Sequence, residues 1–142
     1  MGPPAREPVG LVLARTAKVV SRAFDDALAD AGGSLPTWLV LVSLQQGRHG
    51  AQRELAEAVG IEGPTLTHHL NRMEAAGLVT RTRDPANRRV HRVELTDAGS
   101  EAFRRLVGAV RTFDRRLRRG LTQEQVDGLD DLLGRLRTNV AS

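Results

Sequence analysis

The chain has 142 residues, enough for one domain with a buried core and too few for two independent domains of ordinary size. It contains no cysteine, which excludes disulfide bonds, thiol redox sensing and cysteine-ligated metal clusters. The formal net charge is +4, and the window from Arg72 to Arg92, with six arginines and two acids, accounts for all of it. Such clustering favours a polyanionic partner, because grouped cations displace counterions from phosphates.

The sequence carries no signal of export or membrane insertion. The amino terminus lacks an apolar run of signal-peptide length, and no segment approaches the roughly 18 uncharged apolar residues that a membrane span needs. We therefore expect a cytoplasmic protein with no membrane partner.

Two helices are predicted before the basic window. The first runs from about Val9 to Ala31, and its apolar stripe of about five turns exceeds what a small core covers. A partner subunit is the natural candidate for the rest of that stripe. The second helix, Ser34 to Gln46, is apolar nearly all round and is expected at the centre of the core. Trp38, the only tryptophan, is predicted to pack there, with the wall of a ligand pocket as the alternative.

A helix-turn-helix follows. A short helix from Arg53 to Val59 leads into a turn from Gly60 to Gly63, and Pro64 begins the next helix at a favoured position. On that next helix, apolar residues spaced by four and three positions anchor one face to the core: Leu66, Leu70 and Met73. Four polar residues are left facing outward: Thr65, His68, His69 and Arg72. Thr67 and Asn71 flank them.

A hairpin and two helices complete the chain. The segments Leu78 to Thr82 and Val90 to Leu95 have strand patterns around a polar, proline-containing tip. Thr96 is predicted to cap a helix from about Ala98 to Arg119. Residues Thr122 to Gln125 fit a capping box for the last helix. That helix has an apolar stripe formed by Val126, Leu129, Leu132, Leu133 and Leu136.

This order of parts resembles the MarR family of bacterial transcription regulators, and more closely its SlyA-like members, over nearly the whole chain. The motifs that carry the likeness are the helix-turn-helix, Gly77-Leu78-Val79, Asp84-Pro85-x-x-Arg-Arg and Leu95-Thr96-x-x-Gly99. The resemblance implies a single domain over residues 1–142, mainly α with a small β-hairpin wing. In it, a winged helix-turn-helix at 34–96 lies between dimerisation helices at 8–33 and 98–140.

The resemblance also implies an obligate homodimer bound to double-stranded DNA at a palindromic operator. The unpartnered apolar stripes of the terminal helices agree with this expectation. The second helix of the helix-turn-helix fits the major groove, where its polar groups can meet base edges and phosphates. We expect Arg72 at a guanine edge or a phosphate, and Asn71 at an adenine or at the flank of the contact.

The wing supplies the remaining predicted DNA contacts, which are Arg83, Asn87, Arg88 and Arg89. The resemblance places Arg89 in the minor groove, where a narrow groove concentrates negative potential. Arg83 and Arg88 are expected at phosphates. Many relatives have an aspartate two residues before the inserted arginine, and this chain has Asn87 there, so Arg89 is expected to be oriented less firmly.

A small-molecule effector is a further implication of the resemblance. In the family it is often a phenolic or other aromatic carboxylate that binds between the dimerisation helices and the winged module. The implied pocket residues are Val12, Arg15, Val19, Trp38 and Val42. Arg15 can meet a carboxylate, and an exposed position at the helix edge is its alternative. No cofactor is expected.

Other functions have weaker support in the sequence. The histidines are His49, His68, His69 and His91, and adjacent residues on a helix diverge by about 100°, so His68 and His69 do not readily chelate one metal ion. No nucleophile–base set, phosphate loop or close carboxylate pair is recognisable, so an enzyme is not predicted. The leading prediction is a ligand-responsive, dimeric DNA-binding repressor. The alternatives are a winged module used for protein interaction and a metal-responsive sensor.

Overall fold

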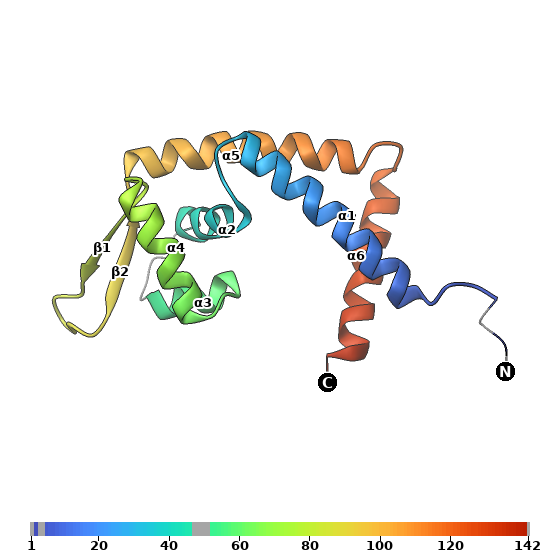
Figure 1. Cartoon of the computed structure of the whole chain (residues 1–142), viewed down its shortest axis with the longest axis horizontal. Coiled ribbons are helices and arrows are strands. Elements are labelled where there is room, and N and C mark those ends of the chain that lie inside the picture. Colours follow the sequence, from blue (N-terminus) through green and yellow to red (C-terminus); the bar gives the residue numbers. More distant parts are fainter. Residues whose placement is uncertain (1, 3–4, 47–51, 142) are drawn as a thin grey trace. The chain divides into compact units, whose positions relative to one another are not determined.

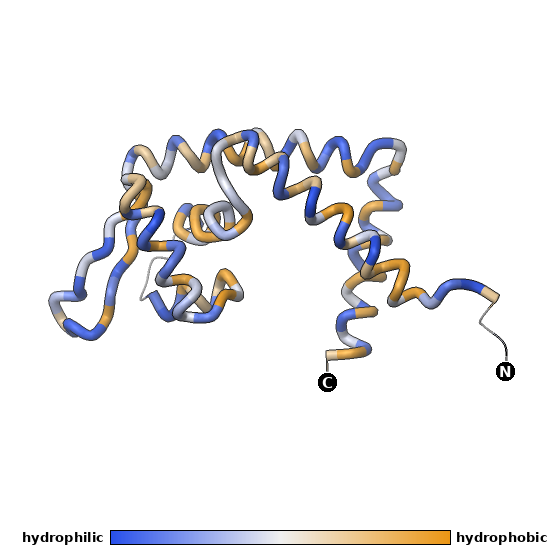
Figure 2. The backbone as a smooth tube through the Cα atoms, in the orientation of Figure 1, coloured by the Kyte–Doolittle hydropathy of each residue, from blue (hydrophilic) through white to orange (hydrophobic). Residues whose placement is uncertain are grey.

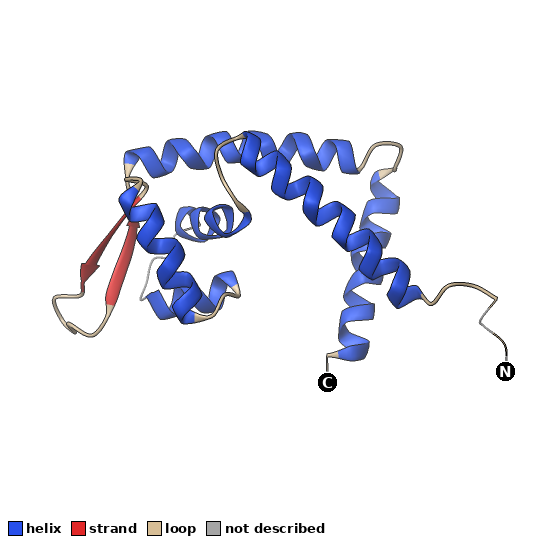
Figure 3. Ribbon diagram, viewed as in Figure 1, coloured by secondary structure: helices blue, strands red, loops and turns tan. Residues whose placement is uncertain are grey.

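The computed structural model describes residues 2, 5–46 and 52–141. The chain forms two compact units, Met1–Val110 and Arg111–Ser142. The described elements, labelled in Figure 1, are α1 (Val9–Asp30), α2 (Leu35–Gln45), α3 (Gln52–Val59), α4 (Gly63–Ala75), β1 (Val79–Arg83), β2 (His91–Leu95), α5 (Asp97–Leu117) and α6 (Gln123–Val140). Figure 3 shows that the described residues are mainly helical with one hairpin, which confirms the predicted fold class.

Two glycines with positive φ end the two helices of the helix-turn-helix. Gly60 (φ 76°) ends α3, and Gly77 (φ 78°) separates α4 from β1. After each helix the chain turns back with the same kind of backbone hydrogen bond, Ile61 N–H to Ala56 C=O at 3.1 Å and Leu78 N–H to Met73 C=O at 2.9 Å. Because L side chains disfavour this conformation, the glycines fix where α3 ends and where the wing begins.

Side-chain caps set the starts of α5 and α6 as the sequence predicts. The Thr96 hydroxyl accepts a hydrogen bond from Gly99 N–H at 3.0 Å. Helix α5 therefore begins at Asp97, one residue earlier than predicted. At α6, Thr122 Oγ1 accepts from Gln125 N–H at 3.1 Å, and Gln125 Oε1 accepts from Thr122 N–H at 2.9 Å. This reciprocal pair confirms the capping box and satisfies two N–H groups that the helix leaves free.

The hydrophobic core lies in the first unit. Helix α2 is among its most hydrophobic parts (Figure 2), and Val40, Leu41 and Leu44 of this helix are buried. The buried cluster also takes residues from the other helices of this unit and from both strands: Leu28, Leu55, Leu66, Leu70, Met73, Val79, Val93, Ala102 and Leu106. The three predicted anchors of α4 are therefore buried, which fixes the opposite face of this helix toward solvent.

The hairpin pairs β1 with β2 antiparallel, in register from Val79 opposite Leu95 to Arg83 opposite His91. Each predicted strand begins one residue too early. Leu78 N–H is bonded back to the end of α4, and Val90 N–H is bonded to Asn87 C=O within the tip at 2.9 Å. The first strand contacts α4, whereas the second contacts α2 and α3. The wing is therefore attached to the helix-turn-helix through both strands.

Apolar side chains remain exposed on the outer helices. In the second unit, α6 has no buried residue, and its predicted stripe includes Leu132 at 58% exposure. In the first unit, α1 exposes Val9, Leu11, Val12, Leu13 and Val19. Of the described helices, none alone combines the length and hydropathy of a membrane span; only α1 and α2 taken together do, and they meet at a bend of 73°.

Candidate nucleic-acid interface

Helix α4 presents a polar face opposite its buried anchors. Thr65, His68 and Arg72 are exposed, and their spacing of three and four residues places them on one side of the helix. No ion pair or hydrogen bond involves their side chains among the described residues. This side of α4 therefore offers a hydroxyl, an imidazole and a guanidinium to a ligand.

Thr67 and His69 are placed differently from these three, since both are half-buried. The Thr67 hydroxyl accepts a hydrogen bond from Gln52 Nε2 at 2.6 Å and donates to Gly63 C=O at 3.0 Å. It therefore joins the start of α3 to α4. The His68 and His69 rings lie 5.8 Å apart at 59°, as expected for neighbours that diverge around a helix.

Arg81 of β1 connects the wing to α4. Its guanidinium donates to Glu74 Oε1 at 2.9 Å and to Asn71 Oδ1, and its backbone N–H donates to Glu74 Oε2 at 3.1 Å. The Arg81 side chain is only 18% exposed. Hydrogen bonding from the Arg81 side chain lowers the pKa of the Glu74 carboxyl below its ordinary value.

Asp84 organises the tip of the wing. Its Oδ1 accepts from Ala86 N–H at 2.8 Å, and its Oδ2 accepts from the Arg92 guanidinium at 3.0 Å across the hairpin. The backbone hydrogen bond from Ala86, followed by the side-chain bond from Arg92, lowers the pKa of Asp84. The turn and the two strands are thus tied to one carboxylate.

These two ion pairs divide the arginines of the basic window into paired and unpaired ones. Both acids of the window are used, because Glu74 pairs with Arg81 and Asp84 with Arg92. The four remaining arginines are exposed and have no described acidic partner: Arg72, Arg83, Arg88 and Arg89. The net charge of +4 therefore belongs to side chains that lie on α4 and the wing and are available to an anionic ligand.

Asn87 acts on the backbone of the wing tip. Its Oδ1 accepts a hydrogen bond from Arg89 N–H at 3.2 Å, while the Arg89 guanidinium is exposed. A side-chain bond of this kind is typical of asparagine in turns. Asn87 thus fixes the position of the Arg89 backbone, and its side chain has no described contact with the Arg89 guanidinium.

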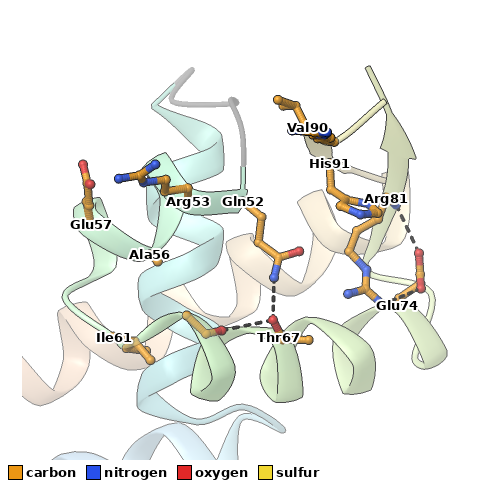
Figure 4. Close-up of a pocket in the computed structure, with 12 residues that line it drawn as sticks. Gln52, Arg53, Ala56, Glu57, Ile61, Thr67, Glu74, Arg81, Val90 and His91 are labelled. Carbon is orange, nitrogen blue, oxygen red and sulfur yellow. Dashed lines mark hydrogen bonds and ion pairs between the residues drawn. The ribbon is translucent and has the colours of Figure 1, made fainter. Parts of the chain in front are cut away.

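A cleft of about 1000 Å³ lies between the helix-turn-helix and the wing. Figure 4 shows Gln52 and Arg53 of α3 on one side, Thr67 and Glu74 of α4 below, and Arg81 and His91 of the hairpin on the other side. Arg89 also lines it. The concave surface is mixed in charge, since Glu57 and Glu74 face it with the arginines.

The residues predicted for an effector pocket have mixed environments. Trp38 is half-buried and stacks on Phe103 of α5, with ring centroids 5.6 Å apart and planes within 5°. Val42 is half-buried, whereas Val12 and Val19 are exposed on α1. Arg15 is also exposed and forms an ion pair with Glu7. The proposed pocket residues therefore stay a prediction.

Metal binding finds no further support in the described part of the chain, where no three His, Asp or Glu side chains gather into a possible site. His91 is exposed at the start of β2. His49 lies outside the described residues.

Sequence reasoning missed the internal roles of Gln52, Arg81 and Arg92. It counted Arg81 and Arg92 as part of one basic patch, although each has an acid seven or eight residues earlier. The sequence does show that the window contains two acids, enough to pair with two of its six arginines. It does not show which arginines are paired, because the partners meet only after α4 and the hairpin have folded.

The fold and this surface define a winged-helix protein. The MarR family model matches residues 34–91. The transcriptional repressor CouR, solved bound to a 23-mer DNA duplex, is 30% identical with a TM-score of 0.82, over 91% of this chain and 92% of that one. The chain belongs to the MarR family, a family of transcription regulators.

Two further solved structures are similar to this chain over most of their length. CouR from Rhodococcus jostii RHA1, bound to p-coumaroyl-CoA, is 26% identical with a TM-score of 0.75, over 89% of this chain and 90% of that one. BpsR from Bordetella bronchiseptica, whose DNA binding is regulated by 6-hydroxynicotinic acid, is 24% identical with a TM-score of 0.83, over 95% and 97%. The latter likeness supports the fold. The SlyA-like subgroup stays a prediction.

Proposed function

We propose that the protein is a DNA-binding transcriptional repressor that reads an operator with α4 and the wing. The observation that carries this proposal is the group of four exposed arginines without described acidic partners, all on the module whose polar helix face is free. Helix α4 enters the major groove, and the wing lies over the adjacent backbone and minor groove. The residues assigned to DNA are Thr65, Thr67, His68, His69, Asn71, Arg72, Arg83, Asn87, Arg88 and Arg89.

The division of work among these residues follows from their chemistry. Thr65, His68 and Arg72 face away from the core and supply base and phosphate contacts in the major groove. Arg88 and Arg89, at the wing tip, add salt-dependent affinity, and Arg89 inserts into the minor groove. The hydrogen bond that Asn87 Oδ1 accepts from the Arg89 backbone N–H gives the Arg89 backbone a fixed position for that insertion.

The active form is a homodimer on a palindromic operator, with residues 8–33 and 98–140 forming the dimerisation helices around a winged module at 34–96. The exposed apolar side chains of α1 and α6 support this arrangement, because such stripes are normally covered. Two-fold symmetry places two recognition helices in successive major grooves, about 34 Å apart. The protein acts in the cytoplasm, because the chromosome of a bacterium lies there.

A small aromatic or phenolic carboxylate relieves repression in this proposal. Two of the similar structures concern regulators with aromatic ligands, p-coumaroyl-CoA and 6-hydroxynicotinic acid. The pocket is assigned to Val12, Arg15, Val19, Trp38 and Val42. Arg15 supplies the charge that a carboxylate requires, in competition with Glu7.

The test begins with selection of bound fragments from random DNA by the full-length protein. The affinity for the selected palindrome is then measured across a salt series. Log affinity should fall against log salt with a slope of about −0.9 per phosphate contacted. Charge reversal at Arg72 and Arg88 should abolish binding. Equal binding of every sequence, or affinity that does not respond to salt or to these substitutions, would refute the proposal and favour a protein-interaction module.

A further inference from the structure

We propose that Arg81 is a positioning residue that holds the wing against α4, the recognition helix, and makes no contact with DNA itself. This inference rests on the proposed DNA-binding function. It assigns Arg81, Glu74 and Asn71 the joint role of fastening β1 to α4, which a count of charges in the basic window does not reveal.

The contacts define a two-point attachment between β1 and α4. One residue, Arg81, uses both oxygens of the Glu74 carboxylate, one through its guanidinium at 2.9 Å and the other through its backbone N–H at 3.1 Å. The guanidinium also donates to Asn71 Oδ1, one helical turn before Glu74. A backbone bond together with a side-chain bond fixes the position of the strand as well as that of the arginine, because a side-chain contact alone leaves the strand free to move.

The wing needs such an attachment. It is a two-stranded sheet, and an isolated hairpin of this size is only marginally stable in water. Val79 and Val93 anchor its base in the core, but the tip with Arg88 and Arg89 extends beyond them. The distance between the helix in the major groove and the arginines of the tip therefore depends on the angle between β1 and α4, which the Arg81 contacts set.

Arg81 is poorly placed to serve as a phosphate contact. Its side chain is 18% exposed, and its charge is matched by Glu74. A guanidinium has only donors, so the Asn71 side chain must turn its oxygen toward Arg81. The amide N–H groups of Asn71 then point away from Arg81, which favours a base or phosphate acceptor as the partner of Asn71.

The direction in which Glu74→Gln changes DNA affinity separates this positioning role from a purely electrostatic effect. Glu74→Gln removes a negative charge close to the proposed DNA surface, so electrostatics alone predicts tighter binding. Positioning predicts weaker binding, because a neutral amide offers Arg81 only one of the two acceptor oxygens that the Glu74 carboxylate provides. We expect affinity to fall by about tenfold, the usual size of an effect of losing a hydrogen bond to a charged group. The matched control is Glu94→Gln, which removes an exposed hairpin carboxylate with no described partner.

The experiment measures affinity for the selected palindrome across a salt series for wild type, Glu74→Gln, Arg81→Gln, the double variant and Glu94→Gln. We expect both single variants to bind more weakly with the wild-type salt slope, and the double variant to be no weaker than either. Glu94→Gln should bind at least as tightly as wild type. Tighter binding by Glu74→Gln, or a slope reduced by about 0.9 in Arg81→Gln as for a lost phosphate contact, would overturn the proposal.

Arg81→Lys keeps the charge and covers the case in which Arg81→Gln does not fold. A lysine is a single point donor and does not reproduce the planar fork that reaches Glu74 and Asn71 together. We expect an intermediate loss of affinity at unchanged slope, and wild-type affinity would contradict the proposal.

A measurement without DNA separates this inference from the proposed function. Amide hydrogen exchange of residues 79–95 should be faster in Glu74→Gln than in wild type and Glu94→Gln, since the hairpin opens more often. Unchanged exchange would overturn the positioning role. Failure of the wild-type protein to select any DNA sequence would refute the proposed function instead.

Discussion

Gly99 at the start of α5 packs directly against the backbone carbonyl of Leu78, so that a Cβ at position 99 would overlap the carbonyl oxygen. Thr96 reinforces this junction by donating its hydroxyl hydrogen to Gly77 C=O at 2.5 Å and its N–H to Leu78 C=O at 3.1 Å. The end of the recognition helix is therefore joined to the start of α5 through backbone atoms, which cannot move aside as a flexible side chain can.

Gly99→Ala is expected to lower the free energy of unfolding by about 1–3 kcal/mol, because the methyl group must displace backbone at the junction. Urea denaturation measures the change. The matched control is Gly108→Ala in the same helix, where a Cβ meets nothing within 4 Å. This control should raise stability by about 0.5–1 kcal/mol through better helix propensity. Equal effects of the two substitutions would contradict the packing argument.

The division of the arginines into paired and unpaired classes predicts different salt dependence of DNA binding. Arg88→Gln should reduce the steepness of log affinity against log salt by about 0.9, because an exposed, unpaired arginine neutralises a phosphate. Arg92→Gln removes the same charge from a pair with Asp84 and should leave the slope unchanged. Fluorescence anisotropy with a labelled operator gives both slopes. A similar change of slope in both variants would show that the Asp84 pair opens on DNA.

The lowered pKa values of Glu74 and Asp84 predict loss of stability in acid. Each folded-state pKa lies below the ordinary value of its carboxyl, so the stability that each contributes is fully present above that ordinary pKa. It is lost as pH falls through the lowered folded pKa. The free energy of unfolding of wild type should therefore approach that of Asp84→Asn as pH falls from about 6 to about 3.

Chemical denaturation at a series of pH values measures this difference. Glu94→Gln, which also removes one hairpin carboxylate, controls for the change in net charge. A difference in the free energy of unfolding between wild type and Asp84→Asn that grows as pH falls would contradict a lowered pKa of Asp84 in the folded protein.

The exposed stripe of α6 predicts a dimer that one substitution can disrupt. Leu132 is 58% exposed in the single chain, so Leu132→Glu should leave the helix intact while burying a charge in any subunit interface. Self-association should weaken by about a hundredfold or more, because an unpaired buried charge costs several kcal/mol. Thr138→Glu, on the other side of α6, should remain dimeric. Sedimentation velocity distinguishes these outcomes, and a dimeric Leu132→Glu protein would place the interface elsewhere.

The proposed effector pocket predicts a response of the single tryptophan. Titration with 4-hydroxybenzoate should change Trp38 emission and release DNA over the same concentration range. Glu7→Gln should strengthen binding of the carboxylate by about two- to fivefold, since it frees Arg15 from an exposed ion pair. Arg15→Gln should weaken it. Release of DNA without any change in Trp38 emission would move the effector site away from Trp38.

Much of the local structure followed from short patterns in the sequence. The spacing of Leu66, Leu70 and Met73 predicted which face of α4 is buried, because helical geometry leaves little choice once a core is present. The reciprocal cap of Thr122 and Gln125 was predicted for the same reason, since its partners lie three residues apart. Strand limits were less accurate, because they depend on where the hairpin tip closes its own hydrogen bonds.

The sequence by itself determined the winged helix-turn-helix pattern and the concentration of the net charge between Arg72 and Arg92. Only the tertiary structure decided which arginines of that window are available. Arg81 meets Glu74 across the junction of α4 and β1, and Arg92 meets Asp84 across the hairpin. A charge count treats all six arginines alike, whereas ion pairing depends on distances of a few ångström that exist only when helix and strands are packed together.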